Sequence, residues 1–213
     1  MQEIVQSQAA ETEAQVGGAD LRGAPRFALM LRSAKLIADG TEFLCIIRDV
    51  SETGLKLRLF HPVPSAELLM IETASGQRYP MNVVWEAKGE AGFRFAQRID
   101  VDAFVSESGP YPKRPLRLRV HHPAVVRIGS ETQSAVILDI SRQGARIETH
   151  NRLAIGQKFC LEAHNLPTFE ATVCWRRMPE YGIVFAQLMG LDELAQRVER
   201  LERTPPSEDD KLA

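Results

Sequence analysis

The stretch Asp49-Val50-Ser51-Glu52-Thr53-Gly54 lies between an apolar run at residues 43–47 and an alternating run at residues 55–59. A polar segment that ends in glycine between two such runs is typical of a turn that joins two strands. The pattern Asp-x-Ser-x-x-Gly returns as Asp139-Ile140-Ser141-Arg142-Gln143-Gly144, with similar flanks. The remainder of the chain can be aligned on these two turns.

A constant offset of 90 residues relates the two halves beyond the turns. It separates Trp85 from Trp175 and Gly92 from Gly182, just as it separates the two motif aspartates. Each tryptophan ends a Val-x-Trp triplet, and each is followed by a Gly-x-x-Phe-Ala segment. An offset without insertion indicates two copies of one fold. A unit of this length can form a domain with its own core.

Strand-like runs recur about every ten residues in the first half, separated by Gly, Pro, Asp and Ser. The runs lie at residues 34–37, 43–50, 55–59, 68–73, 78–85 and 92–96. This spacing predicts a small all-β barrel or sandwich. Alternation places Val83 and Trp85 on one face, so we expect each tryptophan to pack inside its barrel.

Two helices are also predicted. Asp100 can cap a short helix that carries Val101, Phe104 and Val105 on one face. A second helix covers residues 190–203. Its apolar stripe comprises Leu191, Leu194, Ala195, Val198 and Leu201. We expect this helix to pack on its barrel, and a surface for a partner is the alternative.

These features divide the chain into two folded units and three segments with little to bury. The first unit spans residues 20–105, and the second, with its C-terminal helix, spans residues 113–203. We expect residues 1–19 to be a disordered arm, residues 106–112 a linker and residues 204–213 a disordered tail.

Composition and charge are those of an ordinary soluble globular protein. The formal net charge is −2, and no apolar run approaches the roughly 20 residues that span a bilayer. Residues 1–19 contain no basic side chain, so they cannot be the basic start of a secretory signal. Cys45, Cys160 and Cys174 form no C-x-x-C pair, which favours reduced, buried thiols in a cytoplasmic protein.

A pair of basic residues spaced i, i+4 precedes each turn. The first pair is Arg22 and Arg26, and the second is Lys113 and Arg117. The second member of each pair lies 23 and 22 residues, respectively, before the motif aspartate. A proline inside each segment disfavours a regular helix. We therefore expect each pair to lie on an extended arm that leads into the first strand of its unit.

Side chains of these types can together bind a guanine nucleotide. Guanidinium groups can engage phosphate oxygens or the O6/N7 edge of guanine with two hydrogen bonds, and they can stack on a purine. Asp49 can accept hydrogen bonds from the N–H donors of guanine, Ser51 adds a hydroxyl group, and Gly54 lets backbone approach a ligand closely. The set predicts a guanine nucleotide that carries more than one phosphate.

Arg-x-x-x-Arg, followed by Asp-x-Ser-x-x-Gly and then by the Trp and Gly-x-x-Phe-Ala segments, resembles the PilZ domain. The resemblance covers residues 20–105 and 112–190. It implies an all-β chain of two tandem six-stranded antiparallel barrels, each followed by a short C-terminal helix. It also implies a non-catalytic receptor for the bacterial second messenger cyclic di-GMP, with no metal or other cofactor.

The resemblance assigns a ligand-binding role to five residues in each unit, two as a clamp and three as a floor that reads guanine. The set of the first unit comprises Arg22, Arg26, Asp49, Ser51 and Gly54. The set of the second unit comprises Lys113, Arg117, Asp139, Ser141 and Gly144.

The second site departs from the family pattern at Lys113, because a lysine lacks the fork with which arginine clamps or stacks. Arg142 and Arg146 add positive charge around that turn, whereas Glu52 places an acid in the first turn. The sequence favours the first site over the second. In the family, an extra arginine before the first motif arginine favours a stacked ligand dimer. Leu21 and Pro112 stand there instead, so we expect one ligand per competent site.

Three alternatives are open from the sequence. Tandem barrels without ligand binding could act as a protein-interaction scaffold. A barrel that binds single-stranded RNA is disfavoured, because no series of interleaved aromatic residues is present for stacking. An enzyme is least favoured, because the sequence shows no nucleophile–base pair, metal-ligand cluster or phosphate loop. We expect a cytoplasmic receptor for cyclic di-GMP that also binds a protein partner, without nucleic acid or membrane insertion.

Overall fold

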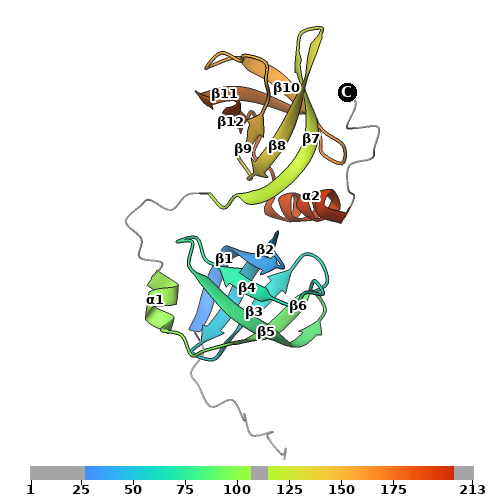
Figure 1. Ribbon diagram of the computed structural model, residues 1–213. Coiled ribbons are helices and arrows are strands. Elements are labelled where there is room, and N and C mark those ends of the chain that lie inside the picture. The colour runs from blue at the N-terminus through green and yellow to red at the C-terminus, as the bar shows by residue number, and fades with distance from the viewer. Residues whose placement is uncertain (1–26, 107–114, 204–213) are drawn as a thin grey trace, which may run out of the picture.

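The computed structural model describes residues 27–106 and 115–203, which form two six-stranded barrels and two helices (Figure 1). The strands of barrel 1 are β1 (Phe27–Ala38), β2 (Thr41–Ser51), β3 (Gly54–Leu59), β4 (Leu69–Glu72), β5 (Arg78–Ala87) and β6 (Glu90–Phe95). The strands of barrel 2 are β7 (Leu118–Ile128), β8 (Glu131–Ile140), β9 (Gly144–Glu148), β10 (Lys158–Glu162), β11 (Phe169–Arg177) and β12 (Glu180–Phe185). The helices are α1 (Val101–Ser106) and α2 (Leu191–Arg203).

Both barrels are closed, antiparallel and identical in topology. The strand order is β1-β2-β3-β6-β5-β4 in barrel 1, and barrel 2 repeats it as β7-β8-β9-β12-β11-β10. The predicted fold class is confirmed, and the barrel is preferred to the sandwich because each sheet closes on itself. The main difference from the predicted runs is β1, which begins at Phe27 because its first residues pair with the end of β2, far along the sequence. The expected arm and tail lie outside the described residues, and so does the expected linker except for Ser106, which is the last residue of α1.

Side-chain alternation builds the cores. In β7, Leu118, Val120, Ala124 and Val126 are buried, whereas Arg119 between them is exposed. Alternate residues of a strand point to opposite faces, so such a strand places one row of side chains inside and one row outside. Full burial of a leucine or valine side chain stabilises a fold by about 1.5–3 kcal/mol.

Helix α1 closes one side of barrel 1, as the sequence predicts. Asp100 caps it, because its carboxylate accepts a hydrogen bond from the Ala103 amide at 3.1 Å. Phe104 is buried, with its ring 5.2 Å from the ring of Tyr79 and 6.1 Å from that of Phe95. The helix therefore belongs to the core of barrel 1.

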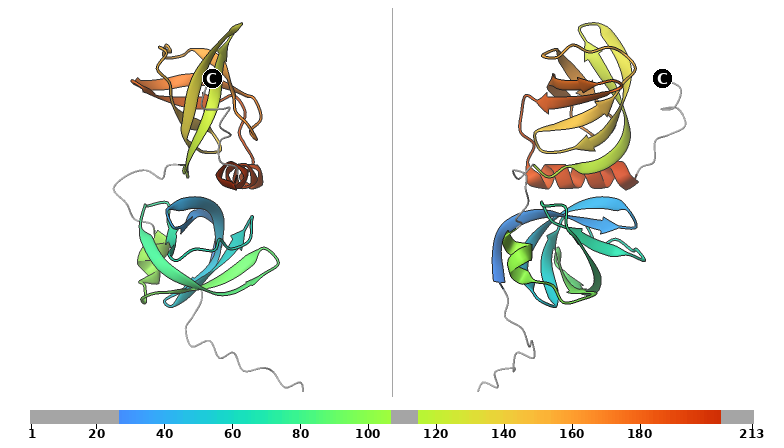
Figure 2. Two further views of the ribbon diagram at one scale, coloured as in Figure 1. Left: turned by 45° about the vertical axis from the view of Figure 1, so that its right-hand side comes forward. Right: turned by 60° about the vertical axis from the view of Figure 1, so that its left-hand side comes forward.

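Helix α2 lies between the two barrels in each view (Figures 1 and 2). Its buried stripe joins the core of barrel 2 through Leu194, Ala195, Val198 and Leu201. Leu44, from β2 of barrel 1, is 2% exposed and belongs to the same cluster. The predicted packing of this helix on its own barrel is confirmed, and the helix also contacts barrel 1.

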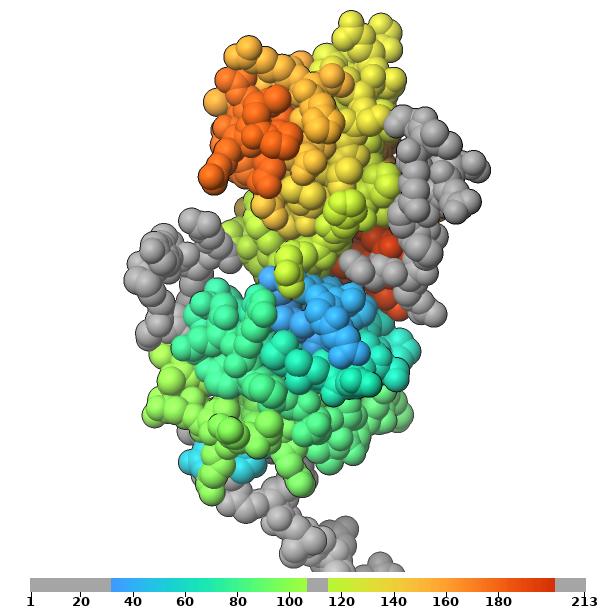
Figure 3. Space-filling model, viewed as in Figure 1, coloured from blue at the N-terminus to red at the C-terminus, as the bar shows by residue number. Residues whose placement is uncertain are grey.

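A charged contact joins the barrels beside this apolar one. Glu42 of β2 accepts a hydrogen bond from the Arg119 Nε of β7 at 2.6 Å, and its other oxygen lies 3.0 Å from the Lys35 Nζ. Only 1% of the Glu42 side chain is exposed. Figure 3 shows the surface of barrel 1, blue at this level, meeting the yellow-green start of barrel 2.

The Glu42 carboxylate is expected to make the stability of the chain sensitive to acid. Burial opposes its ionisation, but hydrogen bonds and charge from Arg119 and Lys35 outweigh burial and lower its pKa from 4.5. An acid with a lowered pKa stabilises the fold fully above its unfolded pKa, and this stabilisation is lost as the pH falls through the folded value. In urea unfolding, the stability difference between the wild type and Glu42→Gln should stay constant from neutral pH to about pH 5 and shrink below pH 4.5. A difference that grows on acidification would contradict this assignment.

The three cysteines differ in burial although all are free thiols. Cys45 is fully buried, and burial raises its pKa far above the ordinary value. Cys160 is partly buried, but Cys174 is exposed, so the expectation of a buried thiol is wrong there. The reason is a register shift between Val173 and Trp175, which makes Cys174 the extra residue of a bulge. No helix within the described ranges is long and apolar enough to cross a bilayer.

Candidate functional site

A β-bulge turns the motif aspartate of each barrel to the outside. Cys45 and Ile47 of β2 belong to the core of barrel 1, so an unbroken strand would point Asp49 inward as well. The register with β3 shifts between Ile47 and Asp49, which makes Arg48 an extra residue. Val50 then occupies the next inner position and is fully buried, and Asp49 takes the opposite face of the sheet, where it is half-buried. The same shift precedes Asp139 in barrel 2.

Cross-strand pairing extends each aspartate into a row of four residues across the outer face. In barrel 1, Asp49 pairs with Lys56, Lys56 with Gly92, and Gly92 with Trp85. The row thus runs from β2 through β3 and β6 to β5. The equivalent row of barrel 2 is Asp139, Arg146, Gly182 and Trp175. We call these the outward rows. Each contains an acid, a cation, a glycine and an indole.

The tryptophans lie on the surface, so the expectation that they pack inside the barrels is wrong. Trp85 and Trp175 are both 41% exposed. A bulge between Val83 and Trp85 breaks the alternation that would otherwise place both on one face. The indole instead covers the glycine of the next strand, since a Cβ on Gly92 would lie 2.1 Å from the Trp85 Nε1. Each glycine therefore provides the space in which its indole lies flat on the barrel.

The motif serines stabilise their turns through hydrogen bonds. Ser51 and Ser141 are buried, and each hydroxyl donates to the carbonyl of the motif glycine, at 3.2 Å in barrel 1 and 3.0 Å in barrel 2. A hydroxyl group has one proton to donate, and each serine uses this proton in the hydrogen bond within its turn. The structure supports a role for both serines in shaping the floor.

The motif glycines allow two strands to approach each other. A Cβ on Gly54 would lie 2.4 Å from the Phe93 carbonyl oxygen, and one on Gly144 would lie 2.0 Å from that of Ile183. Sequence reasoning expected close approach of the backbone to a ligand. The approach that the structure shows is between β3 and β6, and between β9 and β12.

In barrel 2 the motif aspartate binds two guanidinium groups. The Arg117 Nη1 lies 2.7 Å from one Asp139 oxygen, and the Arg146 Nε lies 2.8 Å from the other. Arg146 also contacts Glu180 at 3.1 Å. Burial opposes the charge of Arg146, but the ion pairs outweigh it and raise its pKa. The structure thus brings together Arg117 and Asp139, which the sequence predicted as clamp and floor.

In barrel 1 the described residues show the floor of the predicted site. The Lys56 Nζ lies 2.6 Å from Glu90, the counterpart of Glu180. Glu52, the acid in the first turn, is paired with Arg98, whose Nε lies 3.1 Å away. This pairing neutralises a charge that would otherwise oppose an anionic ligand. The predicted clamp residues Arg22, Arg26 and Lys113 lie outside the described residues.

The unequal spacing of the two basic pairs has a structural explanation. The pairing of β1 with β2 is irregular between Ala28 and Arg32, and that of β7 with β8 is irregular between Arg119 and His122. The first irregularity contains one more residue than the second. This extra residue accounts for the difference between the two separations, which are 23 residues from Arg26 to Asp49 and 22 residues from Arg117 to Asp139.

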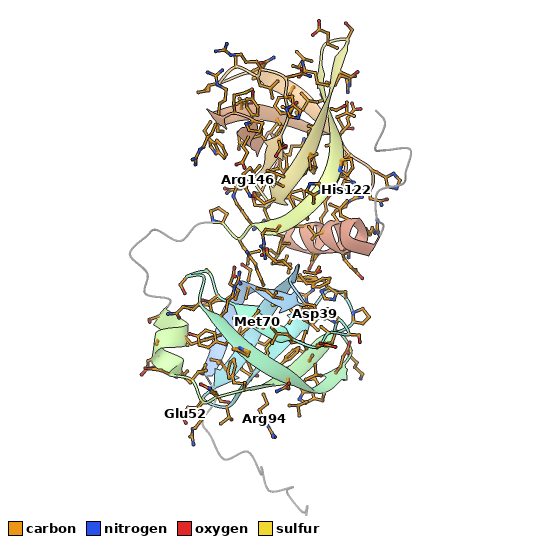
Figure 4. All side chains as sticks on the ribbon, in the orientation of Figure 1. Asp39, Glu52, Met70, Arg94, His122 and Arg146 are labelled. Carbon is orange, nitrogen blue, oxygen red and sulfur yellow. The ribbon has the colours of Figure 1, made fainter. Side chains whose placement is uncertain are left out.

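The two sites face different surroundings. Figure 4 places Glu52 at the end of barrel 1 that points away from barrel 2, whereas Arg146 lies on the side of barrel 2 that faces barrel 1. A cavity of about 280 Å³ adjoins the second turn, and Leu44 of barrel 1 lines it together with Arg142 and Gln143. Among the described residues, the turn of barrel 1 therefore lies far from barrel 2, and the turn of barrel 2 lies at the junction of the barrels.

Lys56 and the two tryptophans are the members of the outward rows that sequence reasoning missed. The 90-residue offset contains a signal for Lys56, because it aligns Lys56 with Arg146. Both residues lie two positions after the motif glycine. The tryptophans were assigned to the core because a bulge leaves no mark in the alternation pattern. No group of His, Cys, Asp and Glu in residues 27–106 and 115–203 has the arrangement of a metal site.

A family model for the PilZ domain matches residues 20–107 and again residues 113–201. The chain belongs to the PilZ domain family. Each barrel, with its turn and outward row, is one PilZ domain of a tandem pair. No curated protein matches the chain.

Solved structures similar to this tandem PilZ chain include two complexes with c-di-GMP. PlzA of Borreliella burgdorferi is 11% identical, with 85% of this chain and 96% of that chain covered and a TM-score of 0.33. YcgR of Escherichia coli is 16% identical, with coverages of 85% and 88% and a TM-score of 0.33. The inhibitor of motility MotI/DgrA of Bacillus subtilis is 11% identical, with coverages of 83% and 97% and a TM-score of 0.35.

Proposed function

We propose that this chain is a non-catalytic receptor for cyclic di-GMP. The observation that carries the proposal is the repeated outward row beside a repeated Asp-x-Ser-x-x-Gly turn, with the same register in both barrels. Membership of the PilZ family supports this ligand, and so do the complexes of PlzA and YcgR with c-di-GMP.

The chemistry of each outward row matches the parts of the ligand. The carboxylate accepts hydrogen bonds from the N–H donors of guanine, the cation offsets a phosphate charge, and the exposed indole offers a face for stacking. Neighbouring strands lie about 4.8 Å apart, so the three strand steps from Asp49 to Trp85 span about 14 Å. A dinucleotide can contact several members of such a row at once.

Site 1 is completed by the arm that carries Arg22 and Arg26. These arginines clamp the phosphates and stack on a base, while Asp49 and Lys56 bind from the barrel surface. Pairing of Glu52 with Arg98 favours this anionic ligand, because it removes an unpaired negative charge from the turn.

Site 2 requires an exchange of partners when ligand binds. Arg117 leaves Asp139 and turns to a phosphate, so Asp139 becomes available to guanine while Arg146 still holds it in place. The Arg117 side chain is 44% exposed, and its ion pair is weakened by solvent, so the exchange has a small cost. Lys113 contributes a positive charge but lacks the forked guanidinium group with which an arginine clamps a phosphate. The first site therefore binds the ligand more strongly than the second.

Binding brings the clamp residues into contact with the ligand and alters the surfaces that the chain presents to a protein partner in the cytoplasm. The physical basis is the set of charge-assisted contacts that the clamp residues make with the ligand. Because site 2 lies at the junction, its occupation also changes the contact between the barrels.

The two tryptophans of the chain provide a separate reporter for each site, because one lies in each outward row. In Trp175→Phe the remaining fluorescence reports site 1, and in Trp85→Phe it reports site 2. Cyclic di-GMP is expected to change the fluorescence of each variant at saturation, with site 1 filling first, and GTP is expected to have little effect. Calorimetry of the wild type should give one ligand per competent site.

Two results would contradict the proposal. Absence of both heat and fluorescence change would favour the alternative of a protein-interaction scaffold that keeps the turns without binding nucleotide. An equal response to GTP would show a general phosphate surface instead of a site selective for cyclic di-GMP.

A further inference from the structure

Glu42 is a carboxylate that is almost completely buried between the two barrels. Its side chain is 1% exposed, and three donors contact it: the Lys35 Nζ at 3.0 Å, the Arg119 Nε at 2.6 Å and the Arg119 backbone amide at 2.9 Å. Burying an ionised carboxylate is costly unless it is paired and hydrogen-bonded. Two of the three donors belong to barrel 2, so removal of barrel 2 would leave this charge poorly compensated.

The residue that Glu42 holds belongs to the framework of site 2. Arg119 lies directly opposite Asp139 in the β7–β8 ladder and two positions after Arg117. The ladder is irregular between Arg119 and His122, so the first residues of β7 pair with β8 in a register of their own, although Leu118 packs in the core of barrel 2. Glu42 binds this short segment through both the side chain and the backbone of Arg119. Barrel 1 thus anchors the part of barrel 2 that carries the clamp.

The duplicated fold offers an internal comparison. Lys35, Glu42 and Leu44 of barrel 1 all lie at the barrel–barrel contact, and their counterparts at the 90-residue offset are Val125, Thr132 and Ser134. The hairpin of barrel 2 has the same fold but does not face another barrel (Figure 1). The buried charge is therefore a property of the contact between barrels and not of the barrel fold.

We propose that Glu42 of barrel 1 is a positioning residue for the cyclic di-GMP site of barrel 2. The inference rests on the proposed function. Glu42 fixes Arg119, Arg119 fixes the start of β7, and the start of β7 sets the distance of Arg117 from Asp139 and from the ligand. Ligand binding at site 2 is thereby coupled to the packing of the barrels through one carboxylate.

The test measures each site separately in the full chain. Glu42→Gln keeps the size of the side chain and removes its charge. Read through Trp175 in the Trp85→Phe background, it is expected to weaken cyclic di-GMP binding at site 2 about ten-fold. Read through Trp85 in the Trp175→Phe background, binding at site 1 is expected to stay unchanged, although Glu42 itself belongs to barrel 1.

Glu72→Gln is the matched control. Glu72 is also buried in barrel 1, and its ion pairs are with Lys35 at 2.9 Å and Arg78 at 2.6 Å, both in its own barrel. The control should alter stability without changing the affinity of site 2. Arg119→Ala should weaken site 2 as Glu42→Gln does, and the double variant should be no weaker than either single variant. Without ligand, hydrogen exchange at the Arg119 amide should be faster in Glu42→Gln than in the wild type.

The outcomes separate this inference from the proposed function. If the wild type binds no cyclic di-GMP, or binds it only at site 1, there is no second site for Glu42 to position and the inference fails with that part of the function. If the wild type binds at site 2 and Glu42→Gln leaves that affinity unchanged, only the inference fails. If Glu42→Gln weakens both sites equally, or if Glu72→Gln weakens site 2 as much as Glu42→Gln does, the effect is a general loss of stability. Either result would also overturn the inference.

Discussion

Replacing Arg117 with alanine is expected to weaken cyclic di-GMP binding at site 2 about ten- to a hundred-fold, which corresponds to roughly 1.5–3 kcal/mol. The variant removes a guanidinium group that can make charge-assisted bonds to a phosphate. It also removes one partner of Asp139, but Arg146 remains 2.8 Å from that carboxylate, so the floor of the site should stay in place. Calorimetry with fluorescence of Trp175 in the Trp85→Phe background provides the measurement.

Arg127→Ala is a suitable control for this variant. Arg127 lies on the same strand, β7, and pairs with Glu162 at 2.6 Å, away from the turn. Its loss should leave both affinities unchanged. Arg26→Ala should show the reciprocal result, with weakening of the same size at site 1 and none at site 2. An Arg117→Ala protein that binds as tightly as the wild type would refute the assignment of the clamp.

Replacing Gly144 with alanine is expected to destabilise barrel 2 by about 2–4 kcal/mol. The added Cβ would lie 2.0 Å from the Ile183 carbonyl oxygen and 3.1 Å from the Val184 Cα. Both atoms belong to the backbone of β12, which pairs with β9 at this point, so neither can move without disturbing the ladder. Urea unfolding of the full chain, followed by circular dichroism and Trp175 fluorescence, measures the loss.

Gly190→Ala is the same substitution at a position where the added Cβ has only ordinary van der Waals contacts, and it serves as the control. The nearest atom to its added Cβ would be the Glu193 Cβ at 3.7 Å. Its stability should remain within about 0.5 kcal/mol of the wild type. If Gly144→Ala is equally mild, the close approach of β9 to β12 does not require a glycine, and the motif glycine must then be explained by ligand contact alone.

Much of the fold could be predicted because its signals are local and occur twice. Turn residues, alternating runs and the 90-residue offset gave two equal all-β units, and Asp100 marked the start of α1. The candidate site was predicted in part. Asp139 and Arg117 meet as expected, whereas Lys56 and both tryptophans were missed as members of the outward rows.

The amino-acid sequence by itself determined that the chain contains two copies of a small β-fold with a turn and a basic arm in each. A repeat, a turn and an alternating strand are encoded in residues that are close in sequence. Tertiary structure alone decided which way the important side chains point. One extra residue in a β-bulge moves Asp49 and Trp85 from the inner to the outer face, and the alternation rule cannot place that residue.

Tertiary structure also decided that the two domains are not equivalent. The turns of barrels 1 and 2 share the pattern Asp-x-Ser-x-x-Gly, yet one lies at the end of barrel 1 that points away from barrel 2 and the other lies at the junction. Burial of Glu42 depends on where Arg119 lies in space, 77 positions further along the chain. A charge in a strand hairpin is usually solvated, and only the packing of one barrel on the other excludes water from this one.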